Sequence, residues 1–424
     1  MLGVGCARTP PEGDPGRGGP GGGAMPHPFG SHLFAYPPGL LLPSGGQQAL
    51  DDAVAGYYDR WQAAYLVPKC GGYVVLTGGG TGATPGSFTV SEGHGYGMVI
   101  AALMAGHDPR AREKFDGLHA VFRAFPSSNH RDLMAWQILA RCPPGESCTE
   151  VAPGCFRVAD SSGSATDGDL DVAYALLLAD RQWGSEGAVD YFREARRVMS
   201  AIEAREMNQA THLPMLADDI GPGDETFYTT RPSDFMLDHF RAFGRATGDP
   251  FWMLAVDAVH GLVATLQQGY APTTGLLPDF VVKTEAAPEP APPGWPEDEG
   301  VTTGEYSYNS CRVPWRLATD LVASGDERAR QELARINGWI PKATAGKPAS
   351  ILDGYRLDGS RGSEAGGPHP AFTAPFTAAA IAGGDQAWLD ALWAESLRAP
   401  LGGYYGDTVR LLSLVVASGN WWIP

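Results

Sequence analysis

Apolar residues recur at helical spacing along most of this chain, and this periodicity restricts its fold more than any other feature. The first stripe contains Leu50, Val54, Tyr58, Trp61 and Tyr65, at the spacings of three and four that mark an amphipathic helix. Similar stripes occupy residues 95–106, 169–182, 189–205, 234–246, 250–267, 309–323, 326–339, 372–383, 386–397 and 404–418. Many of them end at or near Gly or Pro, which commonly terminate helices. The pattern predicts about a dozen helices, with residues 73–77 as the main convincing strand.

The helical region fits one domain, residues 31–424. A chain of 424 residues with 43% hydrophobic residues can bury a sizeable core. We find no tight repeat of the solenoid kind. Helix hairpins arranged around a central axis would form an α-toroid, whose loops at one end create a cleft. The polar, Pro-rich residues 285–299 are interpreted as either a passive insertion or a loop that lines this cleft.

Residues 1–30 differ from the rest because they are rich in Gly and Pro and lack apolar periodicity. Such a segment is typical of a flexible tether. Leu2-Gly3-Val4-Gly5-Cys6 resembles the end of a bacterial lipoprotein signal, in which a small residue precedes the lipidated cysteine. We therefore expect a longer signal, membrane attachment only through a lipid on Cys6, and a protein that is secreted or attached to the outside of the bacterial envelope.

Charge and cysteine content restrict the partners. The net charge of −17 and the lack of a visible basic face argue against nucleic-acid binding. Acidity keeps a protein soluble, and it would also attract a cationic sugar polymer. Cys142, Cys148 and Cys155 fall in one short segment, so we predict a local disulfide suited to an oxidising compartment, with the pairing open. A zinc site is less favoured because no CxxC or His-rich spacing accompanies them. The sequence indicates no metal or organic cofactor.

Two segments place acids at predicted helix starts with more glycine than a helix cap requires. In residues 90–98, Glu92 precedes glycines at every second position. In residues 164–176, Asp167, Asp169 and Asp171 enter an apolar helix, with a glycine between the first two. Acids at helix starts often do no more than complement the helix dipole. That interpretation leaves the glycines unexplained, since they cost helix stability and instead allow a backbone or a ligand to approach closely.

A third segment, residues 306–316, places two aromatics, an amide and an arginine ahead of another predicted helix. The distinctive motifs are SEGHGYGM at 91–98, LMAW at 133–136, SATDGDLDVAYALLLAD at 164–180, SDFM at 233–236, LPDF at 277–280, NSCRVPWR at 309–316 and YYGD at 404–407. Together they resemble bacterial glycoside hydrolase family 8, which contains endoglucanases, chitosanases, lichenases and some xylanases. The resemblance runs from about residue 30 to the C-terminus. It implies an all-α (α/α)6 barrel and hydrolysis with inversion.

The resemblance also implies roles for two acids. Glu92 matches the family's proton donor, and Asp167 matches the residue that holds the distorted sugar at the centre of the cleft. An inverting enzyme needs an acid and a base about 6.5–9.5 Å apart, so that the attacking water fits between them. A helix start favours an ionised Glu92, whereas a proton donor must stay protonated. We therefore expect burial or the neighbouring Asp167 to raise the pKa of Glu92.

The base is where the chain departs from much of the family. Many members carry Asp at the position of Asn309, and an amide can orient water but cannot take its proton. The resemblance is therefore to the subgroup with Asn here, which includes chitosanases and lichenases. In chitosanases of that subgroup a Glu ten residues before the Asn serves as base, and this spacing falls on Glu299. Glu297 and Glu305 are the alternatives, and each would otherwise belong to a solvated acidic loop.

Several other residues are expected to contact the sugar. Trp136, Tyr404 and Tyr405 are candidate sugar-facing aromatics, although core packing explains them about as well. Arg312 is expected to pair with a carboxylate of the site or to fix a helix end. The favoured function is an endo-acting, monomeric hydrolase of chitosan, cellulose or mixed-linkage β-glucan. A non-catalytic glycan-binding toroid is the alternative, and a helical scaffold for protein partners explains the clustered acids and glycines less well.

Overall fold

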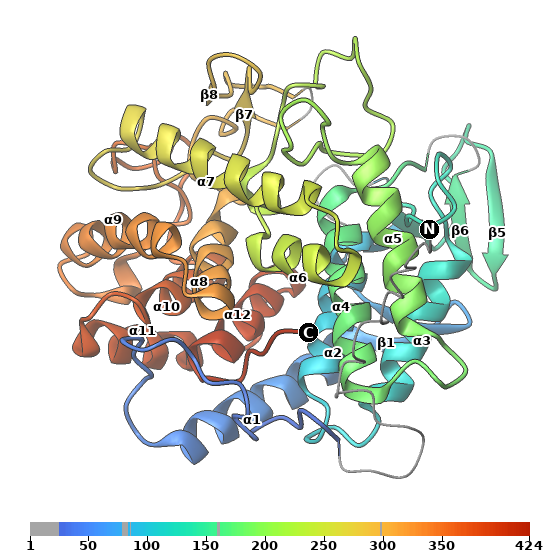
Figure 1. Cartoon of the computed structure of the whole chain (residues 1–424), viewed down its shortest axis with the longest axis horizontal. Helices are drawn as coiled ribbons and strands as arrows, with labels where there is room; N and C mark the ends of the chain where they lie inside the picture. Colours follow the sequence, from blue (N-terminus) through green and yellow to red (C-terminus); the bar gives the residue numbers. More distant parts are fainter. Residues whose placement is uncertain (1–24, 79–83, 85, 159–161, 297–298) are drawn as a thin grey trace, which may run out of the picture.

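The computed structural model of the chain describes residues 25–78, 84, 86–158, 162–296 and 299–424. Within these ranges twelve α-helices alternate between an inner and an outer layer (Figure 1). The inner helices are α2 (Ser91–Leu103), α4 (Thr166–Trp183), α6 (Leu237–Thr247), α8 (Val313–Ser324), α10 (Pro370–Ala380) and α12 (Tyr404–Ala417). The outer helices are α1 (Gln47–Tyr65), α3 (Ala111–Ala124), α5 (Tyr191–Arg205), α7 (Phe251–Gly269), α9 (Glu327–Ala343) and α11 (Gln386–Arg398). This arrangement confirms the predicted (α/α)6 barrel.

Burial separates the two layers. In α2 every residue except Glu92 is buried, and α10 and α12 are buried almost all round. A helix buried on all sides belongs inside a barrel, whereas an amphipathic one covers it. α3, α5 and α9 are amphipathic and bury one face. α3 is absent from the stripes that we recognised in the sequence, although Phe115, Leu118 and Phe122 follow helical spacing along it.

The glycines around Glu92 allow close packing between elements. A Cβ on Gly95 would lie 2.7 Å from the Asp171 Cβ and 2.8 Å from a backbone oxygen of Gly168. A Cβ on Gly168 would lie 2.6 Å from the backbone of Ser91. The paired glycines therefore bring the N-terminal turns of α2 and α4 together, which places their acids side by side.

Strands are more numerous than the sequence predicted, but they are short. β1 (Leu66–Lys69) pairs with β2 (Gly72–Val75), which overlaps the predicted strand. A four-stranded antiparallel sheet has the order β3 (Ser87–Val90), β4 (Gln137–Leu139), β6 (Cys155–Val158) and β5 (Cys148–Ala152). β7 (Val281–Val282) pairs with β8 (Glu289–Pro290), and only β8 lies inside the Pro-rich region. Strands of two to five residues carry too few alternating positions to be recognised from periodicity.

Two disulfides cross-link this β region. Cys142 bonds Cys148, which confirms a local disulfide in this segment. Cys155 instead bonds Cys70, 85 residues away, and so ties β6 to the turn between β1 and β2. Cys311 is buried and unpaired. Cys6 lies outside the described residues.

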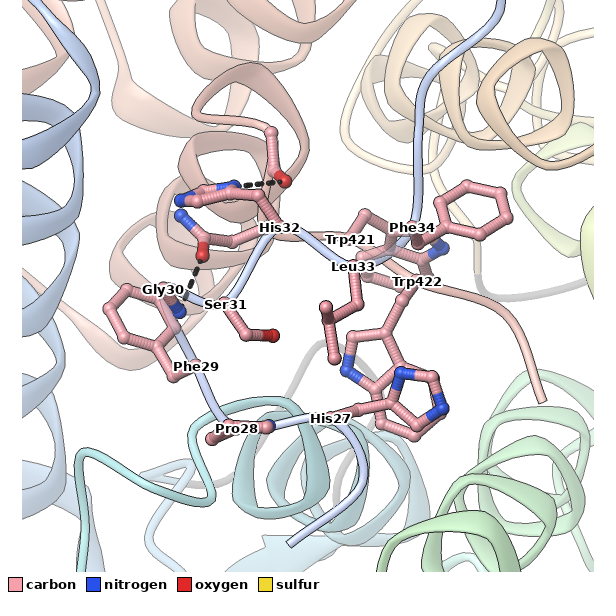
Figure 2. Close-up of a pocket in the computed structure, with 12 residues that line it drawn as sticks. His27, Pro28, Phe29, Gly30, Ser31, His32, Leu33, Phe34, Trp421 and Trp422 are labelled. Carbon is pink, nitrogen blue, oxygen red and sulfur yellow. Dashed lines mark hydrogen bonds between the residues drawn. The ribbon is translucent and has the colours of Figure 1, made fainter.

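The two ends of the described chain pack against each other beyond the C-terminal ends of α2 and α12 (Figure 2). The His27 ring stacks on Trp422 with centroids 4.4 Å apart, and the Gly30 amide donates to Asn420 Oδ1 at 3.0 Å. The Phe29 amide donates to Ala105 O, just beyond the C-terminus of α2, at 2.7 Å. Residues 27–30 therefore pack onto the body, ahead of the predicted domain start at residue 31. Among the described helices, none is long and apolar enough to cross a membrane.

The two disulfides should contribute unequally to stability. A cross-link restricts the unfolded chain, and in the chain-entropy account its effect grows with the length of the loop it closes. Cys70–Cys155 spans 85 residues and Cys142–Cys148 spans 6. Replacing the first pair by Ser should therefore cost about 4 kcal/mol and the second about 2 kcal/mol, measured by urea unfolding. An equal or larger loss from the short loop would contradict this account.

Candidate active site

The N-terminal ends of the inner helices bring charged side chains together at one end of the barrel. Glu92 lies in the first turn of α2, and Asp167 lies in the first turn of α4. Arg312 ends a short 3-10 helix, η2 (Ser310–Arg312), directly before α8. Tyr404 is the first residue of α12. Residues separated by more than 300 positions in the sequence thus meet at this end of the barrel.

Arg312 is the centre of the cluster, and its side chain is 2% exposed. Its Nη1 lies 2.6 Å from Glu92 Oε2 and 3.2 Å from Asp167 Oδ2. The same nitrogen donates to the Tyr96 hydroxyl at 3.1 Å, and Nη2 donates to Asn309 Oδ1 at 3.0 Å. One guanidinium therefore binds both acids and the amide, which agrees with the first of the two roles expected for Arg312, pairing with a carboxylate of the site.

Glu92 is held in a setting that favours its protonated form. Burial raises the pKa of Glu92, the Arg312 cation opposes this increase, and the Asp167 charge adds to it. The Tyr404 hydroxyl donates to Glu92 Oε1 at 3.0 Å and also opposes the increase. The net direction is upward, as expected from burial and Asp167, even though the helix start favours the carboxylate.

Two guanidinium groups shift the pKa of Asp167 in the opposite direction. Burial would raise the pKa of Asp167, but Arg231 and Arg312 outweigh it and the pKa is lowered. Arg231 Nη2 lies 3.4 Å from Asp167 Oδ1, while Arg231 Nε donates to both oxygens of Asp234 at 3.1 Å. We did not identify Arg231 from the sequence, because it lies in a loop 64 residues after Asp167 without a distinctive pattern around it.

The segment with Asn309 is held by a buried carboxylate. Asp279 Oδ1 accepts the backbone amides of Ser307, Asn309 and Ser310 at 3.1, 3.1 and 2.7 Å, and the Ser310 hydroxyl at 2.7 Å. Burial, partly offset by these bonds, raises the pKa of Asp279 to about 6. Four donors on one oxygen fix the turn and therefore the position of the Asn309 amide.

The loop acids occupy different environments. Glu299 is exposed, and its charge contributes to the electrostatic field at Arg231. Burial would lower the pKa of Arg231, but Asp167 and Asp234, with a smaller contribution from Glu299, raise it. Glu305 is instead bound by the Ser363 amide at 2.7 Å. Glu297 lies outside the described residues.

The predicted aromatics do not form one uniform surface. Trp136 is partly exposed, and its carbonyl accepts the Ser91 amide at 2.8 Å, next to Glu92. Tyr404 is 8% exposed, and its hydroxyl binds Glu92. Tyr405 is half-buried, and its hydroxyl lies 3.2 Å from Cys311 Sγ, whereas Tyr308 is 43% exposed. Trp136 and Tyr405 are therefore partly accessible, Tyr308, which was not among the predicted residues, is the most exposed of the four, and Tyr404 binds the acid.

A separate group of potential metal ligands lies on α7, on α8 and at the start of α9. His260, Asp320 and Asp326 can bring one ligand atom each within 4.8 Å of the others. Arg241 donates to Asp320 at 2.6 Å and to Asp326 at 2.7 Å, so a cation already occupies the space between these acids. This group is an ion-pair network that links α6 to α8 and the start of α9.

Comparisons with known proteins agree on one family. The family model described as glycosyl hydrolases family 8 matches residues 81–419. The chain is 40% identical to a β-glucanase of Niallia circulans over 401 residues, covering 93% of this chain and 91% of that protein. It is 37% identical to an endoglucanase of Bacillus sp. (strain KSM-330), covering 91% and 80% of the two chains. The solved apo structure of a β-1,3-1,4-glucanase from Paenibacillus sp. X4 is similar, with a TM-score of 0.85, 39% identity, and coverage of 95% and 100%.

Proposed function

The chain belongs to glycoside hydrolase family 8 and is an endo-acting glycoside hydrolase; from this premise we propose that it cleaves β-1,4 bonds of a mixed-linkage β-glucan by inversion, with Glu92 as general acid. The observation that carries the proposal is the opposite perturbation of two neighbouring carboxyls. The pKa of Glu92 is raised by burial, and the pKa of Asp167 is lowered against burial by Arg231 and Arg312. Carboxyls with divergent pKa values are typical of glycosidase sites.

In this mechanism Glu92 gives its proton to the oxygen of the departing sugar. The side chain is 16% exposed, so its proton can reach a sugar in the cleft. As the bond breaks, positive charge develops on the ring, and the ionised Asp167 stabilises that charge. When Glu92 becomes a carboxylate, Arg312 at 2.6 Å and the Tyr404 hydroxyl at 3.0 Å stabilise the product form.

The attacking water is assigned to Asn309 and Glu299. Asn309 Oδ1 accepts from Arg312 at 3.0 Å, which leaves its side-chain amino group free to orient a water by donating to it. Glu299 is the assigned base, because it is exposed and because its charge acts at Arg231, the partner of Asp167. Glu305 is a weaker candidate, since Ser363 already occupies its carboxylate.

The names of the relatives favour β-glucan over chitosan. They are a β-glucanase, an endoglucanase and a β-1,3-1,4-glucanase. Trp136 and Tyr308 offer apolar ring faces for neutral sugars. We place the enzyme outside the cytoplasm, because its two disulfides suit an oxidising compartment. Attachment through a lipid on Cys6 remains part of this proposal.

The substrate assignment predicts the order of activities on three polymers. Purified enzyme should release reducing ends fastest from lichenan, more slowly from carboxymethylcellulose and least from chitosan. Proton NMR during the first minutes should show the α-anomer at the new reducing end, because one displacement inverts a β-bond. Faster hydrolysis of chitosan would reassign the substrate, and an initial β-anomer would rule out inversion. Binding without any hydrolysis would indicate a glycan-binding toroid.

Removing the acid should abolish turnover without unfolding the protein. Glu92→Gln keeps the shape and the Tyr404 bond but supplies no proton, so kcat on lichenan should fall about 10²- to 10⁴-fold. The affinity for an oligosaccharide, measured by calorimetry, should remain within a fewfold of wild type. An aryl glycoside with a good leaving group should be less affected, because its departure needs no protonation. Near wild-type turnover on lichenan would refute the assignment of Glu92.

Removing the base should be reversible by an external nucleophile. Glu299→Gln should lower kcat on lichenan by about 10²-fold or more, because the water then keeps its proton. Azide attacks without losing a proton, so added azide should restore turnover and yield an α-glycosyl azide. Glu297→Gln and Glu305→Gln are the matched controls, and both should retain most activity. If one of these controls shows the loss and the azide rescue, that residue is the base.

A further inference from the structure

A second group of acids begins two residues after Asp167, and the hydrogen bonds that its members accept come from neutral donors. Asp169, Glu206 and Asp218 are 0, 0 and 3% exposed. Asp169 lies in the first turn of α4, two residues after Asp167, and Glu206 ends α5. The main electrostatic influences on Asp169 and Glu206 come from other acids and from neutral donors, and none comes from Lys, Arg or His. Buried carboxylates without a cation are costly unless they are protonated.

The hydrogen bonds of the pair leave one oxygen on each side without a donor. Asp169 Oδ1 accepts the Met134 amide at 3.0 Å, and Glu206 Oε1 accepts the Ser164 hydroxyl. Asp169 Oδ2 and Glu206 Oε2 are buried and have no other donor. The Ser164 hydroxyl that binds Glu206 lies only five residues before Asp169, and a side-chain hydrogen bond from Glu206 to Asp169 is among the influences on the pKa of both carboxyls. Two ionised carboxylates are both acceptors, so a bond between them requires one proton.

The two helix ends indicate which carboxyl carries that proton. Asp169 lies at the N-terminal end of α4, where the helix dipole favours a negative charge. Glu206 lies at the C-terminal end of α5, where the dipole disfavours it. The favourable arrangement is therefore a neutral Glu206 that donates to an ionised Asp169.

We propose that Asp169 and Glu206 share one proton, held on Glu206 and donated to Asp169, and that this pair positions the start of α4 and the segment of Trp136 for catalysis. The positioning role rests on the proposed function of Asp167 and Trp136, whereas the shared proton does not. Asp169 binds Met134, two residues before Trp136, and follows Asp167 by two residues. The pair thereby connects the segment of Trp136 to Asp167, the acid at the centre of the proposed cleft.

The charged groups with the largest influence on the pair are negative. Asp218 and Asp167 act on Asp169, and Asp218 also acts on Glu206. Asp218 is satisfied by neutral donors, namely the Ser127 hydroxyl at 2.5 Å, the Asn129 side-chain amide at 2.9 Å and the Ser164 amide at 2.9 Å. The surroundings thus supply hydrogen bonds without neutralising charge, which favours retention of the proton.

The shared proton makes stability depend on pH. Burial, followed by Asp169, raises the pKa of Glu206 well above its usual value. The unfolded chain releases this proton above about pH 5, whereas the folded protein keeps it. Since the folded state binds one more proton, its stability falls as pH rises toward the pKa of the folded pair. Each pH unit in this window should raise the unfolding equilibrium constant tenfold through this group alone.

Glu206→Gln isolates this contribution. Gln supplies a permanent neutral donor to Asp169 and an acceptor for Ser164, so the variant should fold without needing the proton. The unfolding equilibrium constant of wild type divided by that of Glu206→Gln should rise between pH 5.5 and 7.5, by up to about tenfold per unit while the folded pair keeps its proton, measured by urea titration. Glu186→Gln, an exposed change in the loop after α4, should give a ratio that is constant with pH.

Two further measurements complete the test. Asp169→Asn should be less stable than Glu206→Gln, because it forces the charge onto the C-terminal end of α5. Asp169→Ala should raise KM on lichenan severalfold through Trp136, whereas Glu206→Gln should leave KM unchanged.

A pH-independent ratio for Glu206→Gln would overturn the shared proton even if catalysis is as proposed. A rise in wild-type Tm with added Ca²⁺, reversed by chelation, would likewise overturn it, because a cation would then hold the carboxylates. An unchanged KM in a folded Asp169→Ala would overturn the positioning role alone.

Discussion

The contact between the Arg312 guanidinium and the two acids Glu92 and Asp167 is the interaction on which the site depends. The Arg312 Nη1 lies 2.6 Å from the Glu92 carboxylate and 3.2 Å from the Asp167 carboxylate. A buried guanidinium is tolerated only where its charge is balanced, and so are the two carboxyls. The three side chains come from the starts of three inner helices. The barrel therefore has to close with these helix starts together, and the Gly95–Gly168 contact makes that approach possible.

The three acids of α4 show how one helix serves three environments. Residues two apart on a helix are rotated by about 200°, so neighbouring acids in this run face different ways. Asp167 faces Arg312 and Arg231, and Asp169 faces Glu206. Asp171 binds Arg316 at 2.7 Å and His239 at 2.8 Å, and these partners lower its pKa to about 2 against burial. The run is thus explained by three separate partners, which a helix-capping interpretation could not provide.

Much of the fold could be predicted from the sequence, because inner and outer helices both leave apolar stripes. The unusual glycines singled out the segments of Glu92 and Asp167, and the resemblance to the family identified these two acids within them. The partners that control the pKa values of these two acids could not be identified from the sequence. Arg231 and Glu206 lie in ordinary sequence, and their importance arises only when the barrel brings them against α4. The Cys70–Cys155 disulfide was missed for the same reason, since 85 residues separate its ends.

The pKa values of Glu92 and Asp167 are shifted in opposite directions because the two carboxyls contact different numbers of guanidinium groups. Both acids occupy the first turn of an inner helix, so the helix dipole favours the charged form of each equally. Asp167 is buried and Glu92 is only 16% exposed, and both contact Arg312. Arg231 lowers the pKa of both acids, but it lies 3.4 Å from Asp167 and is the strongest influence opposing burial there, whereas at Glu92 it is the weakest of the named influences and the further contact among the described residues is the Tyr404 hydroxyl. The second cation is therefore what separates an ionised carboxylate from a proton donor, and Arg231 in turn is held in place by Asp234.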